Sequence, residues 1–358
     1  MTESTISDNI NEAARQLLAG RLVAFPTETV YGLGADAENP AAVARLYAAK
    51  GRPPDHPVIV HVAPDANLSY WARNIPDQAY KLVEAFWPGP LTLILERADH
   101  IPDRVSAGQN TIGLRCPAHP VARQLLEAFS ALKQGNGAVA APSANKFGQV
   151  SPTQASHVRE EFADLKGEDL LVLEGGRAEV GIESTILDLS RLERVGPVLL
   201  RPGHISAADI AGVLGVMPRV NADAAAPKVS GSLKAHYAPH TPLLLRSRAD
   251  IEHLIGLGVG AVLSLAGIPV TTKDERDGRV AILTIGSVVS HASDPSKTGF
   301  TWVQAAENPV DYARDLYANL RSLDHGGFDC LLVQAPPQEA AWHAIQDRLT
   351  RASAALSH

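Results

Sequence analysis

The chain has 358 residues, a net charge of −7 and two cysteines, Cys116 and Cys330. Apolar residues make up 45% and charged residues 20%, which is typical of a globular protein of about two domains. The composition excludes a polycation, the cysteines match no metal-ligand spacing, and neither a signal peptide nor a membrane span is visible, so we expect a cytoplasmic protein with reduced thiols.

The first 216 residues predict a mixed sheet with helices on its faces. A helix is expected over residues 8–18, a strand over 21–27, and a helix over 39–51 with Asn39 as N-cap and Gly51 just past its end. Strands and helices then follow without strict alternation, which favours a mixed sheet over a purely parallel one. The further expected strands are 56–62, 91–95, 111–117, 137–145, 169–176, 184–190 and 197–203, and the helices are 76–89 and 206–216.

Residues 217–240 have the Ala-, Pro-, Gly- and Ser-rich composition of a linker. A smaller Rossmann-like α/β domain is expected after it, over residues 241–358. Its predicted strands are 241–247, 260–266, 279–285 and 328–336, and its predicted helices are 249–258, 307–323 and 338–356. The sequence therefore predicts a catalytic domain over 1–216, a linker over 217–240 and a C-terminal domain over 241–358.

Several common site motifs are absent from the sequence. There is no P-loop, no H-E-x-x-H, and Ser143 lies outside a G-x-S-x-G elbow. Gly256, Gly258 and Ala261 fit a loose G-x-G-x-x-A, but they follow a helix and precede a predicted strand, the reverse of a dinucleotide-binding turn.

Polar side chains gather where the predicted elements end. Taken singly, Lys50 suits the negative end of a helix dipole, which is worth about 0.3–1 kcal/mol, and Arg52 and His61 are compatible with purely structural roles. Donors at other strand ends change this interpretation, because α/β folds build their sites there. These donors are Arg115, Ser143, Asn145, Ser184 and Arg201, and with Lys50 and Arg52 the arginines suit a polyphosphate.

The order of these residues resembles the signature of a known family. Lys50-Gly51-Arg52 followed by Ser143-Ala144-Asn145 is similar to the K-x-R…S-x-N signature of the YrdC-like threonylcarbamoyl-AMP synthases. The stretches "PTETVYGLG", "HPVIVHV", "WPGPLTLIL" and "APSANKFGQVSPT" also resemble this family. The resemblance continues through "HYAP" into a domain like that of the longer, two-domain members. One departure is His56, where members more often carry asparagine.

The resemblance implies a reaction and its partners. Members condense L-threonine, bicarbonate and ATP to L-threonylcarbamoyl-AMP and pyrophosphate, with Mg²⁺ arriving on ATP rather than in a protein metal site. The product is passed to a tRNA threonylcarbamoyl-transferase machinery that modifies the adenosine next to the anticodon. Direct binding of tRNA is expected to be weak or absent.

The resemblance also implies site residues. The catalytic residues are expected to be Lys50 and Arg52. ATP is expected to contact Lys50, Arg52, His56, Thr111, Ser143, Asn145, Thr153, Arg201, His236 and Tyr237. L-Threonine is expected to contact Thr29, Tyr31, His61, Arg115, Ser143 and Ser184. The linker could close over the site through His236 and Tyr237, or it could be a passive tether.

Two other functions agree less well with the sequence. An RNA-binding module is opposed by the −7 charge, by an aromatic content of only 5% and by the lack of basic–aromatic interleaving. A hydrogenase-maturing carbamoyltransferase would need zinc-finger segments, which two cysteines cannot supply. The C-terminal domain offers no convincing catalytic constellation of its own.

Overall fold

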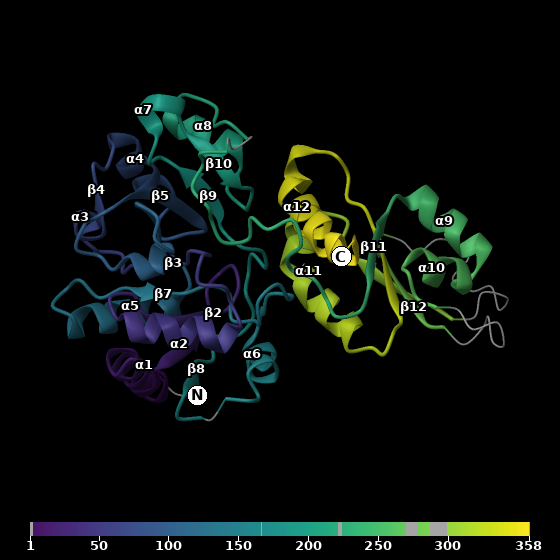
Figure 1. Cartoon of the computed structure of the whole chain (residues 1–358), viewed down its shortest axis with the longest axis horizontal. Helices are drawn as coiled ribbons and strands as arrows, with labels where there is room; N and C mark the ends of the chain where they lie inside the picture. Colours follow the sequence, from purple (N-terminus) through teal and green to yellow (C-terminus); the bar gives the residue numbers. More distant parts are fainter. Residues whose placement is uncertain (1–2, 166, 221–223, 270–277, 287–298, 358) are drawn as a thin grey trace. The chain divides into compact units, whose positions relative to one another are not determined.

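The computed structural model describes residues 3–165, 167–220, 224–269, 278–286 and 299–357 (Figure 1). These residues form two compact units. The first contains Met1–Phe147 and Ser151–Ser232, and the second contains Gly148–Val150 and Leu233–His358. None of the helices in the described ranges combines the length and hydropathy needed to cross a bilayer.

The first unit is built on a ten-stranded mixed sheet in the order β10-β9-β5-β6-β3-β7-β2-β1-β8, with β4 paired to β5. Pairs β3–β6, β5–β9 and β1–β8 are parallel, and the other pairs are antiparallel, so the predicted mixed sheet is confirmed. The strands are β1 Leu22–Phe25, β2 Gly32–Asp36, β3 Ile59–His61, β4 Ala72–Arg73, β5 Leu91–Arg97, β6 Thr111–Arg115, β7 Val139–Ala140, β8 Leu170–Val172, β9 Thr185–Asp188 and β10 Val198–Arg201.

Helices bury two separate apolar cores in this unit. One core joins α1 (Glu3–Leu18) and α5 (Pro120–Leu132) to strands β1 and β7 through residues such as Leu17, Phe25 and Phe129. The larger core gathers α2 (Pro40–Lys50), α4 (Asp77–Phe86) and α8 (Ala207–Leu214). The remaining helical segments are α3 Leu68–Trp71, η1 Asp103–Ser106, α6 Ala155–Glu161 and α7 Leu192–Val195.

Helix α2 has the ends that its sequence predicts, and this fixes where Lys50 lies. The Asn39 side chain accepts hydrogen bonds from the backbone N–H groups of Ala41 and Ala42, and Gly51 ends the helix in the left-handed region with φ 61°. Lys50 is therefore the last helical residue, directly before the loop that leads to β3.

The glycines of β2 serve packing within the sheet. A Cβ added at Gly34 would lie 2.7 Å from Val139 Cγ1 and 2.9 Å from Phe25 Cε1. The lack of a side chain at Gly34 therefore lets β1, β2 and β7 come close together.

The second unit carries a parallel four-stranded sheet in the order β11-β14-β12-β13. Its strands are β11 Leu243–Arg246, β12 Val280–Ile285, β13 Phe300–Ala305 and β14 Cys330–Gln334. Its helices are α9 Arg248–Leu257, α10 Val259–Leu265, α11 Pro309–Asp324, η2 Ala340–Trp342, α12 His343–Ser353 and η3 Ala354–Ser357. Each unit holds one buried free cysteine, Cys116 in the first and Cys330 in the second.

Two predictions for this unit need correction. The strand predicted over residues 260–266 is instead the helix α10, which ends at Leu265 with Ala266 as its C-cap. Val259, Val262 and Leu263 are the buried residues of this helix. Strand β13 was not predicted, because it is only partly buried and lacks the apolar run of a central strand.

Candidate functional site

Lys50 connects the K-x-R motif, residues 50–52, with the S-x-N motif, residues 143–145. Its Nζ donates to the backbone oxygen of Ser143 at 2.7 Å and also to that of Asn145, although 93 residues separate Lys50 from Ser143. Burial, followed by the charge of Arg52, lowers the pKa of Lys50 well below its usual range. The two motifs therefore form one site rather than two.

Arg52 and Arg201 meet at the same serine of the linker. Arg52 Nη2 donates to Ser230 Oγ at 3.1 Å and to the backbone oxygen of Pro57 at 2.8 Å. Arg201 Nη1 donates to the backbone oxygen of Ser230 at 3.0 Å. Both arginines are buried, at 7% and 3% exposure. They are thus held in fixed positions, as a phosphate-binding pair requires.

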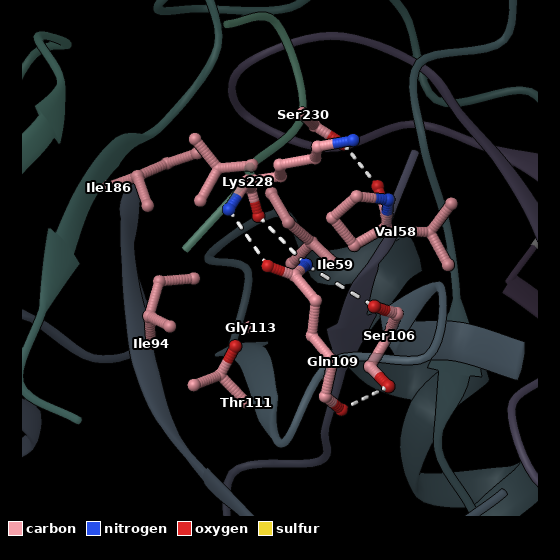
Figure 2. Close-up of a pocket in the computed structure, with 12 residues that line it drawn as sticks. Val58, Ile59, Ile94, Ser106, Gln109, Thr111, Gly113, Ile186, Lys228 and Ser230 are labelled. Carbon is pink, nitrogen blue, oxygen red and sulfur yellow. Dashed lines mark hydrogen bonds between the residues drawn. The ribbon is translucent and has the colours of Figure 1, made fainter. Parts of the chain in front are cut away.

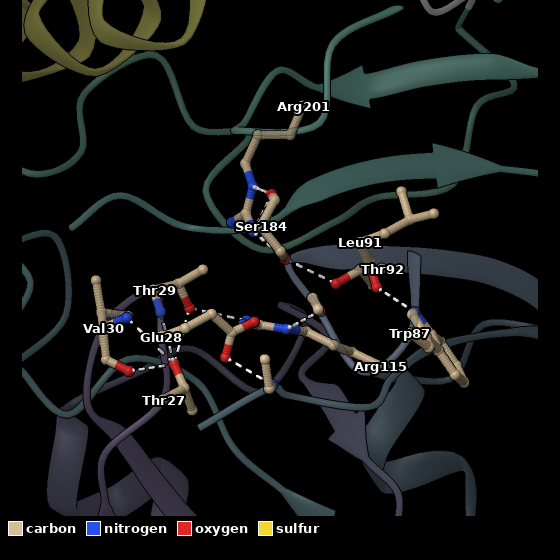
Figure 3. A network of polar contacts seen from close by, with 12 residues as sticks. Thr27, Glu28, Thr29, Val30, Trp87, Leu91, Thr92, Arg115, Ser184 and Arg201 are labelled. Carbon is tan, nitrogen blue, oxygen red and sulfur yellow. Dashed lines mark hydrogen bonds and ion pairs between the residues drawn. The ribbon is translucent and has the colours of Figure 1, made fainter. Parts of the chain in front are cut away.

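Arg201 is also tied to Ser184, at the start of β9. Its Nε and Nη2 donate to the backbone oxygen of Ser184 at 3.0 and 2.9 Å, and Ser184 Oγ lies 2.7 Å from Thr92 Oγ1 (Figure 3). The strand ends of β9 and β10 therefore present their polar groups together.

Arg115 lies at the centre of a second, fully buried network. Its Nη1 donates to Thr29 Oγ1 at 2.9 Å, its Nη2 donates to Glu28 Oε1 at 2.5 Å, and its Nε donates to the backbone oxygen of Gly89 at 3.2 Å (Figure 3). Glu28 Oε2 accepts from the backbone N–H of Ala118 at 3.0 Å. Because a guanidinium has five N–H donors, this network orients Arg115 and leaves donors for a ligand carboxylate.

His61 and Tyr31 lie beside this network. His61 is paired in register with Arg115 across β3 and β6, and burial, followed by the charge of Arg115, lowers the pKa of His61 to about 3. Its Nδ1 is buried and has no partner within the described part of the chain. The Tyr31 backbone oxygen accepts from Ala144 N at 2.8 Å, and the hydroxyl donates to Gly176 O at 2.9 Å. Burial above all raises the Tyr31 pKa to about 12, so the hydroxyl stays protonated.

Ser230 lines an apolar pocket (Figure 2). Pro57, to which Arg52 donates a hydrogen bond, also lines it. Its walls are Ile59, Ile94 and Ile186, and Val229 of the linker packs among them. The space left free inside is about 20 Å³, room for roughly one water. Thr111, which was predicted to contact ATP, lies on its edge.

The side chain of Gln109 binds the backbone of the linker residue Lys228. Gln109 Nε2 donates to the backbone oxygen of Lys228 at 3.1 Å, and Gln109 Oε1 accepts from its N–H at 2.8 Å (Figure 2). Residues 228–230 therefore pack within the first unit.

The other predicted ATP residues are placed as follows. His56 is half-buried, and burial, followed by the charge of Arg52, lowers its pKa. Thr153 is fully buried, and its hydroxyl has no partner among the described residues. His236 and Tyr237 belong to the second unit, where they are buried: His236 N donates to Arg351 O at 3.2 Å, and the Tyr237 ring stacks on that of Tyr317.

Three site residues escaped the sequence analysis: Glu28, Gln109 and Ser230. Glu28 had a signal, because it is the only charge in an otherwise uncharged stretch, "FPTETVYGLG". Gln109 and Ser230 had none, since their roles depend on contacts over more than a hundred residues of sequence. Within the part of the chain that the structure describes, no three His, Cys, Asp or Glu side chains gather to hold a metal ion.

Comparison with known families matches both units. Residues 15–203 match the Sua5/YciO/YrdC family, which is described as telomere recombination. Residues 205–354 match the family described as threonylcarbamoyl-AMP synthase, C-terminal domain.

Individual relatives match along nearly the whole chain. A threonylcarbamoyl-AMP synthase of Pyrococcus abyssi is 35% identical over 356 residues, covering 96% of this chain and 94% of its own. One of Bacillus subtilis is 36% identical over 359 residues, covering 98% and 94%. The crystal structure of P. abyssi Sua5 complexed with L-threonine superposes with a TM-score of 0.80 at 34% identity, over 96% of this chain and 94% of that one.

Proposed function

Since this chain belongs to the two-domain type of the Sua5/YciO/YrdC family, we propose that it condenses L-threonine, bicarbonate and ATP to L-threonylcarbamoyl-AMP and pyrophosphate. It is an enzyme of the nucleotidyltransferase type and contributes to tRNA modification. Within the geometry, the observation that carries this proposal is the contact of buried Lys50 with both Ser143 and Asn145. That contact assembles the signature of the family in one place.

The reaction needs charge stabilisation at two centres. A carbamate oxygen, formed from the threonine amine and bicarbonate with loss of water, attacks the α-phosphorus of ATP as the bond to pyrophosphate breaks. Lys50 and Arg52 stabilise the charge that moves onto the leaving oxygens, and Arg201 holds the phosphates from the opposite strand end. The buried setting of Lys50 strengthens this effect, because water does not screen its charge.

Threonine is assigned to the Arg115 network. The remaining Arg115 donors bind its carboxylate, and neutral His61, Thr29 and Ser184 line the space for its amine and hydroxyl. Tyr31 closes the wall between this network and the Lys50 site.

The apolar pocket suits the adenine ring, with Thr111 at its edge for a polar contact. Since about 20 Å³ is free, the ring enters only when Val229 moves out. His56, Asn145 and Thr153 complete the nucleotide contacts that we assign within the first unit.

Mg²⁺ is proposed to bind as the ATP complex, held by phosphate oxygens and water, because no three His, Cys, Asp or Glu side chains of the described residues gather to hold it. When bound, it neutralises phosphate charge. We place the reaction in the cytoplasm, where the buried thiols of Cys116 and Cys330 stay reduced. The product is proposed to pass to a tRNA threonylcarbamoyl-transferase machinery, with direct tRNA binding weak or absent.

The test is pyrophosphate release by the full chain with ATP, L-threonine and bicarbonate, each omitted in turn, with mass spectrometry of the adenylate. The expected result is release only when all three are present, and its loss in Lys50→Met. Release without threonine, or wild-type rates in Lys50→Met, would overturn the proposal. Serine should be a poorer substrate, although one methyl is worth only about 1–3 kcal/mol.

A further inference from the structure

The loop between Asn145 and Thr153 is divided between the two units. Its ends are held in the first unit, where Phe147 N donates to Lys50 O at 2.8 Å and Tyr31 N donates to Pro152 O at 2.9 Å. Its middle, Gly148–Val150, belongs to the second unit. Two residues assigned to the nucleotide are therefore joined by a segment that the second unit holds.

Backbone hydrogen bonds hold this segment inside the second unit. Ala238 N donates to Gly148 O at 2.9 Å, and Gln149 forms a parallel bridge with Ala238. Arg321 of helix α11 donates from Nη2 to Val150 O at 2.5 Å, across 171 residues of sequence. The Arg321 side chain is 7% exposed, and a buried hydrogen bond from a charged donor is among the stronger ones.

Asp324, one turn after Arg321, binds the residues that follow Ala238, the bridge partner of Gln149. Its carboxylate accepts from Thr241 N at 2.7 Å and from His240 N at 3.0 Å. His240 Nδ1 lies 3.1 Å from Asp324 Oδ2, and its Nε2 lies 2.8 Å from Gln149 Nε2. One tautomer satisfies both contacts: Nδ1–H donates to Asp324, and Nε2 accepts from the Gln149 amide. Helix α11 thus contacts Val150 directly through Arg321, and it contacts Gln149 indirectly, through Asp324 and His240.

We propose that Arg321 is a positioning residue of the nucleotide site, and that the second unit sets the loop 148–150 through it. Asn145 lies three residues before Gly148, and Thr153 lies three residues after Val150. Three residues reach at most about 10 Å, so fixing the middle of the loop restricts both. This inference rests on the proposed function for its activity readout.

The first measurement needs no activity. Amide hydrogen exchange over residues 146–153 is compared in the full-length wild type, Arg321→Met, Arg321→Lys and Arg314→Met. Arg314 is the matched control, because it lies on the same helix and pairs with Asp311 and Asp315 at the surface. We expect faster exchange at Gly148–Val150 in Arg321→Met, partial rescue in Arg321→Lys, whose ammonium still reaches a carbonyl, and no change in Arg314→Met.

The second measurement is the split between substrates. Loss of the Arg321 hydrogen bond should raise the KM for ATP roughly three- to tenfold, since bonds from charged donors are worth about 1.5–3 kcal/mol and only part of this reaches the ligand. The KM for L-threonine should stay within about twofold of wild type, because the residues that bind threonine are held within the first unit. A purely structural role would instead lower kcat with both KM values unchanged.

Unchanged exchange at 148–150, or equal ATP KM values in Arg321→Met and Arg314→Met, would overturn the inference. If Arg321→Met does not fold, Gln149→Ala removes the side-chain contact to His240 and is judged by the same two measurements. Binding of a fluorescent ATP analogue replaces KM if the wild type makes no adenylate. Failure of the proposed function is then distinguishable from failure of the loop assignment.

Discussion

Replacing Glu28 with glutamine should destabilise the first unit strongly. Glu28 and Arg115 form an ion pair at 2.5 Å, with side chains 7% and 4% exposed. The second carboxylate oxygen accepts from Ala118 N, so both oxygens are used. A glutamine has only one oxygen, and its amide would therefore face either the guanidinium or the Ala118 N–H as a second donor.

The expected cost follows from that geometry. Removing one partner of a buried ion pair costs about 3–5 kcal/mol, because it leaves the other charge unpaired. Domains are commonly stable by about 5–15 kcal/mol, so the Glu28→Gln unit should remain folded but lose a large share of its stability.

Amide hydrogen exchange of β6 measures the loss of stability of the first unit alone. The most protected core amides exchange only when that whole unit opens. At about 1.4 kcal/mol per factor of ten, exchange should accelerate roughly a hundred- to a thousandfold or more. Glu84→Gln is the control, because Glu84 is exposed on α4. If β6 exchanges no faster in Glu28→Gln than in the control, the pair does not stabilise the unit and the reasoning fails.

Three further predictions concern the site itself. Burial holds the pKa of Lys50 in the folded protein below the usual value of about 10.4. Between the folded and the unfolded pKa only the unfolded chain binds the extra proton, so the free energy of unfolding should rise with pH in that window. A flat profile of urea unfolding against pH, or an equal slope in Lys50→Met, would contradict this. Arg115→Lys removes the fork and should raise the KM for L-threonine about ten- to a hundredfold while changing that for ATP little; equal shifts in both would remove Arg115 from the threonine site. Val229→Ala should weaken the packing of the linker by about 1–2 kcal/mol and tighten ATP binding, measured by calorimetry, up to roughly tenfold. Val216→Ala, at an exposed position, should leave ATP binding unchanged. Weaker ATP binding in Val229→Ala would mean that the packed linker belongs to the ATP-bound state.

Local chemistry made part of the fold predictable. The Asn39 cap and Gly51 terminator of α2 act within one helical turn, so the position of Lys50 followed from the sequence. The strand ends at Arg115 and Arg201 were predicted in the same way, from short apolar runs that stop at a charged residue.

Contacts between distant segments were not predictable by this reasoning. The run 260–266 is as apolar as a buried strand, and only its packing on one face decides for helix α10. Gln109 gains its role from the backbone of Lys228, which no periodicity or motif brings near it. Glu28 was overlooked because its partner, Arg115, lies 87 residues away in the sequence.

The placement of one buried thiol in each unit has a practical consequence. Burial raises the pKa of Cys116 and that of Cys330 to about 12, so both sulfurs are unreactive towards alkylating reagents while the chain is folded. A timed pulse of such a reagent, followed by peptide mapping, therefore reports separately when each unit opens. Cys116 records the opening of the first unit and Cys330 that of the second, without any introduced label.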